Sequence, residues 1–231
     1  MTRTLLLTAV ALALTGPVAP AASGLAELIA EGERWWTTSP DPGNPVACAT
    51  CHDDVAETRG WAASFPKFKP LPPPHARVMT LLQASAEAVE RHYRLADPKP
   101  GAIAIAAYLT AHGAGVPVTP GISAGQPVFP ERLRALSRAV AEGRRLYARR
   151  CGACHRQTAI SPNVAAVGRA EPLEIFLERH PVRDDPDAPL GWDGEPMAQL
   201  IAYLVAGRAG RPVGLGWLTT VTPERGSPHA P

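Results

Sequence analysis

Apolar side chains recur every three or four residues in two stretches of the chain, and these stretches predict helices that match each other. The first helical face is formed by Leu25, Leu28, Ile29, Gly32, Trp35 and Trp36. The second is formed by Leu133, Leu136, Val140, Gly143, Leu146 and Tyr147. Each face contains a glycine, which predicts a close crossing with another helix, because a missing side chain lets two backbones approach.

The chain also repeats itself on a longer scale. Residues 30–36 (AEGERWW) match residues 141–147 (AEGRRLY), and residues 107–111 (AYLTA) match residues 202–206 (AYLVA). Each half therefore reads as an opening helix, a long middle and a closing helix that crosses the opening one. No stretch alternates apolar and polar residues for long enough to predict a strand, so the pattern indicates an all-α protein.

The boundaries of the two halves follow from the repeat and from a Gly/Pro-rich stretch between them. We expect closing helices at residues 100–112 and 195–207, and a further helix at residues 85–95. The expected organisation is a first domain at residues 23–112, a linker at 113–130, a second domain at 131–207 and a tail at 208–231. Each domain is too small to hold a large core without a cofactor.

A five-residue motif, Cys-x-x-Cys-His, follows the opening helix of each half. It occurs at residues 48–52 and 151–155, and the two copies contain all four cysteines of the chain. This is the attachment pattern of c-type haem. Cysteines three apart lie on one helical turn, where both can form thioethers with the haem vinyl groups. The motifs predict two covalently bound haems, held by Cys48, Cys51, Cys151 and Cys154, with His52 and His155 as iron ligands.

Two other uses of Cys-x-x-Cys fit the chain less well. Paired zinc knuckles usually lie about 15–20 residues apart, whereas the two motifs here begin 103 residues apart. A thioredoxin-like redox pair requires a βαβ setting, which the sequence does not predict.

The N-terminal residues point to a compartment in which haem attachment takes place. Residues 1–22 carry Arg3, then an apolar run at residues 5–14 and small residues at the end, which is typical of a cleaved secretory signal peptide. We therefore expect a soluble protein in the periplasm, which can also lie at the periphery of a membrane-bound respiratory complex. The formal net charge of +2 predicts no large basic patch, so no nucleic acid partner is expected.

The second half resembles the class I cytochrome c family in the stretches LYARRCGACH, SPNVAAVGR and LIAYLVAG. With a second motif present, the chain resembles a dihaem, two-domain form of that family. The resemblance implies two small cytochrome c-like helical domains, in which the carbonyl of Pro162 accepts a hydrogen bond from the imidazole of His155. It covers residues 133–206 well and the first half only at its ends.

The sixth iron ligand of the second half stays open. The family's usual methionine falls near Asp187, and a carboxylate is not a replacement for it. His180, in the loop before the closing helix, and Met197, within or at the start of that helix, are the candidates, and an open site is the third possibility. Met197 can equally be a core methionine, and His180 a solvated histidine at a helix end.

The first half offers three candidates for the same role, His92, Met79 and His75, besides an open site. His92 precedes Tyr108 by the same 16 residues by which Asp187 precedes Tyr203, which favours His92. Its alternative is an exposed histidine among charged neighbours, and that of Met79 is a core residue.

Two further families resemble the first half more weakly. GERWWTT with CATCHDDVAETRG and AVERHYR is similar to the sphaeroides haem proteins, and the middle stretch is weakly similar to the haem subunits of sulfur-oxidising enzymes. The first family implies an asparagine ligand, which would fall near Ala96, where the chain has no asparagine. The second implies a cysteine ligand, and the chain has no spare cysteine. Both departures weaken an enzymatic or gas-binding role.

Together these features predict a periplasmic dihaem cytochrome that transfers single electrons between redox partner proteins. The alternative is a dihaem redox enzyme or enzyme subunit, acting on peroxide or a sulfur oxyanion, in which one iron has an open or displaceable site. Lys67 and Lys69, with Arg169, can surround an exposed haem edge and attract an acidic partner, although such charges are more often merely solvated.

Overall fold

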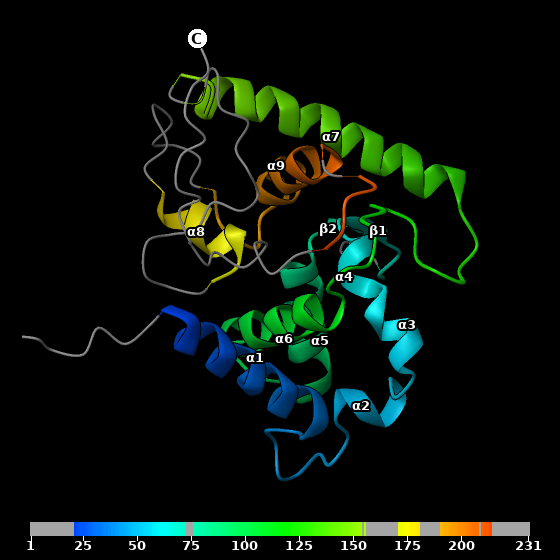
Figure 1. Ribbon diagram of the computed structural model, residues 1–231, viewed down its shortest axis with the longest axis vertical. Coiled ribbons are helices and arrows are strands. Elements are labelled where there is room, and N and C mark those ends of the chain that lie inside the picture. The colour runs from blue at the N-terminus through cyan, green and yellow to red at the C-terminus, as the bar shows by residue number, and fades with distance from the viewer. Residues whose placement is uncertain are drawn as a thin grey trace, which may run out of the picture.

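Helices dominate the part of the chain that the computed structural model describes, which comprises residues 21–72, 76–153, 155, 171–180, 190–207 and 209–213 (Figure 1). Several predictions concern residues outside these ranges: most of the signal peptide, His75, Cys154, Pro162, Asp187 and most of the tail. Within the described residues, no helix is long and apolar enough to cross a bilayer.

The first half contains six helices and a small hairpin among its described residues. The helices are α1 (Ala21–Thr37), α2 (Cys48–Cys51), α3 (Val55–Arg59), α4 (Trp61–Ser64), α5 (Leu81–Tyr93) and α6 (Lys99–His112). The strands are β1 (Lys67–Lys69) and β2 (Arg77–Met79). The described part of the second half contains α7 (Pro130–Arg150), α8 (Leu173–Arg179) and α9 (Glu195–Ala206). The predicted closing helices correspond to α6 and α9.

Helix α5 begins four residues before the predicted start because of a capping box. The Thr80 hydroxyl accepts a hydrogen bond from the backbone N–H of Gln83, and the Gln83 side chain accepts one from the Thr80 N–H, both at 3.2 Å. These two bonds satisfy donors that the first helical turn leaves without a partner. The helix ends at Arg94, which has a left-handed conformation with φ of 54°.

The opening and closing helices of each half cross at a glycine, as predicted. A Cβ atom on Gly32 of α1 would lie 2.0 Å from the carbonyl oxygen of Ala104 in α6. A Cβ atom on Gly143 of α7 would lie 1.9 Å from the carbonyl oxygen of Gln199 in α9. The same contact therefore recurs in both halves, and only glycine fits at either position.

The hairpin is a feature that the sequence analysis missed. Strands β1 and β2 pair antiparallel, with Lys67 opposite Met79 and Phe68 opposite Val78. Three-residue strands are too short to produce a recognisable alternation. The hairpin matters for the architecture because Val78 is buried against Leu136 of α7 and Ala202 of α9. An element of the first half thus completes the core of the second.

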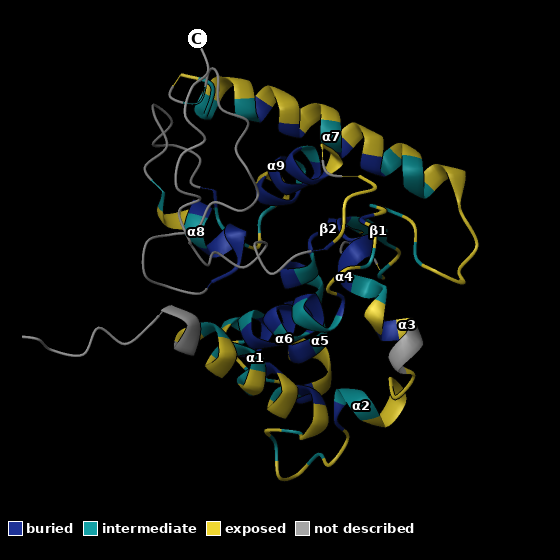
Figure 2. Ribbon diagram, viewed as in Figure 1, coloured by how far each residue is buried: buried dark blue, intermediate teal, exposed yellow. Residues whose placement is uncertain are grey.

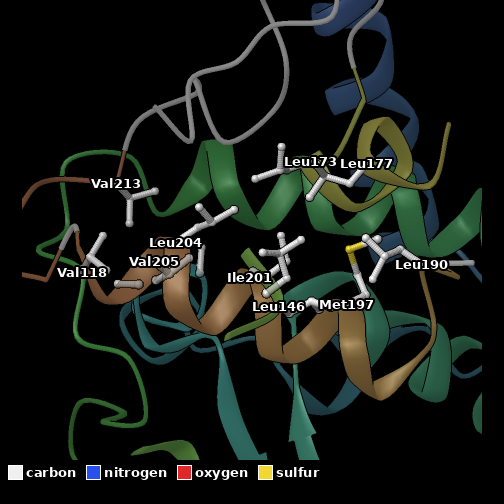
Figure 3. Close-up of a cluster of buried hydrophobic side chains, with 13 residues drawn as sticks. Val118, Leu146, Leu173, Leu177, Leu190, Met197, Ile201, Leu204, Val205 and Val213 are labelled. Carbon is white, nitrogen blue, oxygen red and sulfur yellow. The ribbon is translucent and has the colours of Figure 1, made fainter. Parts of the chain in front are cut away.

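The two halves share a hydrophobic core. Figure 3 shows Val118 beside Val205 and Val213, near the C-terminal end of α9, and Ala62 and Ala63 of α4 belong to the same cluster. The segment between the halves is tied down by backbone hydrogen bonds. Val118 N–H donates to Arg211 O, and Thr119 N–H donates to Ala63 O, each at 2.8 Å. Figure 2 shows that α6 and α9 are mostly buried, whereas α7 exposes its outer face.

A buried carboxyl group also lies between the halves. Glu174 of α8 is 7% exposed, and it accepts a hydrogen bond from the hydroxyl of Thr80, at the start of α5. Burial raises the pKa of Glu174 above its ordinary value of 4.5, and this effect exceeds that of the hydrogen bonds, which lower it.

The helix crossings generate a stability prediction. Gly32→Ala and Gly143→Ala should each lower the free energy of unfolding by about 1–3 kcal/mol, because the added methyl group forces the helices apart. Gly24→Ala is the matched control in α1, since nothing lies within 4 Å of its added Cβ, and it should raise stability by up to about 1 kcal/mol. Urea unfolding of the three variants measures the effect, and equal midpoints for Gly24→Ala and Gly32→Ala would contradict the crossing.

The buried carboxyl predicts a pH dependence. Above pH 4.5 the unfolded chain releases the Glu174 proton while the folded protein still holds it, so folding stability falls as the pH rises toward the raised pKa. Glu174→Gln removes this decline and should be more stable than the parent at neutral pH. If the free energies of unfolding of parent and variant run parallel from pH 4 to pH 8, the pKa of Glu174 is not raised by folding and the prediction is wrong.

Candidate functional site

The first Cys-x-x-Cys-His motif forms a single helical turn. Cys48 and Cys51 are the first and last residues of α2, and the His52 N–H closes the turn by donating to the Cys48 carbonyl at 3.0 Å. The Thr50 hydroxyl accepts a hydrogen bond from the Ala47 N–H at 3.1 Å and fixes the start of the turn. Burial raises the pKa of the Cys48 thiol, whose sulfur lies 3.4 Å from the Tyr93 hydroxyl.

Aromatic rings surround the histidine of this motif. The Trp61 ring packs edge-on against the His52 ring at a centroid distance of 4.8 Å, and the Trp36 ring lies 6.1 Å from it. Trp36 is buried and also contacts Trp61, at 5.9 Å between centroids. Rings packed in this way restrict the orientation of the imidazole.

A cavity of about 460 Å³ opens beside this motif. It brings together four of the predicted site residues, Cys48, His52, Met79 and His92. Apolar side chains from α5 and α6, among them Leu81, Ile105 and Leu109, line it as well. Its size is typical of a cofactor site, and its walls combine apolar side chains with charged ones. Because Cys48 and His52 both line it, the residues present fit a haem tethered at this motif.

Two of the predicted sixth ligands, Met79 and His92, line the cavity. Met79, at the end of β2, is 1% exposed, whereas His92, near the end of α5, is exposed at the mouth of the cavity. The backbone carbonyl of His92 accepts a hydrogen bond from the Asn44 side chain at 2.8 Å, which ties this end of α5 to the loop before α2. The identity of the ligand stays a prediction.

Two lysines of β1 line the same cavity, and both are partly buried. The ammonium of Lys67 donates to the hydroxyls of Ser64, at 3.0 Å, and Ser123, at 2.9 Å. Burial first, and then the neighbouring charge of Lys69, lower the pKa of Lys67 to about 8, with the charge of Glu57 acting in the opposite direction. The pKa of Lys69 is lowered by burial first, and then by the positive charges of Arg91 and Arg132.

The described residues of the second motif repeat the backbone turn of the first. The His155 N–H donates to the Cys151 carbonyl at 2.9 Å, as His52 does to Cys48. Cys151 ends α7, and its N–H donates to the Tyr147 carbonyl at 2.8 Å. The Tyr147 hydroxyl lies 3.4 Å from the His155 carbonyl oxygen, to which it donates.

The imidazole of His180 lies close to that of His155. Their ring centroids are 6.4 Å apart with an interplanar angle of 46°. An imidazole nitrogen binds a metal at about 2 Å, so two imidazoles on opposite sides of one metal have centroids roughly 6 Å apart. His180 directly follows α8 and packs against Phe176 at 5.0 Å between centroids.

Met197, the other candidate of the second half, lies in the hydrophobic core. It is 0% exposed and belongs to a cluster with Leu146, Leu190 and Leu200. Figure 3 shows its sulfur next to Leu190, at the N-terminal end of α9. This packing is that of a core methionine, so the geometry favours His180 over Met197 as the sixth ligand.

Comparison with known proteins bears on the fold. No protein-family model matches the chain, and no curated protein sequence matches it. Among solved structures, SoxXA from P. pantotrophus superposes with a TM-score of 0.61 over 85% of this chain and 78% of that chain, at 14% sequence identity. The fold is cytochrome c-like, as in SoxXA. This confirms the predicted fold class, with the β1–β2 hairpin as an addition to it.

The two neighbouring histidines generate a ligand prediction. His180→Ala should convert the iron held by His155 from a low-spin to a high-spin state, because it removes the second imidazole. Met197→Leu is the matched control, since it conserves core volume at a cost below about 1.5 kcal/mol and should leave the spectra unchanged. EPR and optical spectra of the oxidised variants distinguish them, and a high-spin Met197→Leu beside an unaltered His180→Ala would reverse the assignment.

Proposed function

We propose that the protein is a periplasmic dihaem c-type cytochrome that transfers single electrons between redox partner proteins. One observation supports this proposal: in each half Cys-x-x-Cys-His follows an opening helix that crosses the closing helix at a glycine, after a loop in the first half and directly in the second. The cavity beside the first motif and the neighbouring imidazoles beside the second supply room and ligands for one haem each. The predicted signal peptide places the protein where such haems are attached.

The chain's own residues tether, ligate and enclose the cofactor. The cysteines of each motif supply the two thioether sulfurs, and the histidine of each motif supplies the nitrogen ligand on one side of the iron. When bound, haem iron exchanges one electron between its ferric and ferrous states. Trp36 and Trp61 pack against the ring of His52, and the apolar surroundings of a haem raise or lower its reduction potential by changing how well charge on the iron is solvated.

The contact between the halves connects the two proposed haem sites through packed protein. Leu82 and Ala86 of α5, which runs beside the first cavity, share a cluster with Ile175 of α8, which leads to His180. The two proposed haem sites therefore flank a continuous packed interior. An electron can enter through one half and leave through the other without a change in the relative position of the halves.

The alternative function, a dihaem redox enzyme or enzyme subunit, is favoured by one observation. The first cavity holds both a buried donor, Met79, and a donor exposed at its mouth, His92. An iron ligated by the exposed side chain can exchange it for a small molecule such as peroxide or a sulfur oxyanion.

Haem content tests the proposal. The parent protein should contain two haems per chain by pyridine haemochrome assay, and both should titrate reversibly as one-electron couples. Cys48→Ala/Cys51→Ala and Cys151→Ala/Cys154→Ala should each retain one covalently bound haem, because each removes a single tether. Intact-protein mass spectrometry counts the attached groups.

Two outcomes would contradict the proposal of a dihaem electron carrier. A parent protein with one haem or none would end the dihaem proposal. Rapid binding of carbon monoxide or cyanide to one iron of a two-haem protein would support the enzyme alternative instead, because a carrier keeps both irons six-coordinate.

A further inference from the structure

The two lysines of the first cavity lack the partners that buried cations normally have. Within the described part of the chain, neither Lys67 nor Lys69 forms an ion pair with a carboxylate, whereas Lys99, the third lysine of the chain, pairs with Glu178 at 2.7 Å. Partly buried charges are costly unless an opposite charge or several hydrogen bonds offset the loss of hydration. Glu57 and Glu87 line the same cavity, and Glu57 partly offsets the charge of Lys67, but among the described residues neither glutamate forms an ion pair with a cavity lysine. A bound anion would offset the remaining cost of two partly buried cations on one short strand.

The side chains of both lysines lie at the wall of the cavity. Lys67 and Lys69 are two apart on β1, so their side chains leave the strand on the same face. Both line the cavity that also contains Cys48 and His52. The Lys67 ammonium has three N–H donors, and two of them are directed at the hydroxyls of Ser64 and Ser123. The third N–H has no hydrogen-bond partner among the described residues, although the ammonium also lies 4.5 Å from the centroid of the Phe65 ring.

The lysines lie away from the thiols. Figure 1 shows β1 and α2, which carries the motif cysteines, well separated, with α3 and α4 between them. A haem tethered through its vinyl groups at α2 directs its opposite edge away from that helix, and that edge carries its two propionate carboxylates. The positions of the cations and of the carboxylates therefore correspond.

We propose that Lys67 and Lys69 hold the propionate carboxylates of the haem tethered at Cys48 and Cys51. This inference rests on the proposed function, because it requires a haem in the first cavity. Ser64 and Ser123 act as positioning residues: they hold the Lys67 ammonium at the wall of the cavity and leave one of its N–H groups for the carboxylate. Ser123 thereby gives the segment between the two halves a role in the first haem site.

The test removes each cation in the full-length, two-haem protein. Lys67→Met and Lys69→Met should each lower the reduction potential of one haem, because uncompensated carboxylates stabilise ferric iron. We expect a change of about tenfold in the equilibrium constant for reduction, which corresponds to about 59 mV for a one-electron couple. Lys67→Arg, which keeps the positive charge, should have a reduction potential close to that of the parent. Lys99→Met, which removes the same charge outside the cavity, is the matched control and should leave the potential of the haem at the first motif unchanged.

A second readout identifies the anion. Growth on 5-aminolevulinate labelled with carbon-13 at its carboxyl carbon labels the haem propionates, whose infrared bands then appear in redox-difference spectra. Lys67→Met and Lys69→Met should shift the labelled bands, and Lys99→Met should not. Labelled bands that stay in place in both cavity variants would overturn the proposal, even if the potential changes.

The remaining arm distinguishes a haem carboxylate from an oxyanion taken from solution. Inorganic phosphate is added at constant ionic strength while the potentials are measured. Potentials of the parent that are independent of phosphate support the propionate assignment, whereas a dependence that disappears in Lys67→Met assigns the lysines to a free oxyanion and overturns it. A haem assay accompanies every variant, so that a parent without haem at the first motif counts against the proposed function itself.

Discussion

The structure depends on a backbone-to-backbone contact that occurs twice. Gly32 touches the Ala104 carbonyl and Gly143 touches the Gln199 carbonyl, and in each case the nearest side chain is a tyrosine four residues further on, Tyr108 or Tyr203. The crossing fixes the exit of each opening helix, from which the Cys-x-x-Cys-His turn follows. The position of each proposed haem is thus set by how closely two helices can approach.

The halves do not pack as independent units. Val78, from the hairpin of the first half, fills the core between α7 and α9. Residues of α4 and of the segment between the halves contribute to the cluster around α9. Glu174 lies in this shared interior, where its carboxylate accepts a hydrogen bond from Thr80 of the other half. Such an interior would hold the two proposed haems in a fixed relative geometry.

Short-range signals were predictable from the sequence, and some went unused. The capping box of Thr80 and Gln83 could have placed the start of α5 correctly, because its threonine and glutamine are three residues apart. The β1–β2 hairpin had no comparable signal. Its strands are three residues long, and the pairing of Lys67 with Met79 depends on packing against α7 and α9. The bonds from Lys67 to Ser64 and Ser123 join distant parts of the chain and could not be inferred from spacing.

The sequence by itself determined the two attachment motifs, the opening and closing helices and the glycine at each crossing. These are properties of neighbours along the chain or of a pattern that repeats within one helix. Tertiary structure decided which distant side chains meet. It brings the rings of His180 and His155 close together and buries Met197 in the core, and it brings Met79 and His92 to one cavity. Contacts of this kind depend on how whole helices and strands pack. Nothing in the sequence around residues 79 and 92 predicts that they line the same cavity.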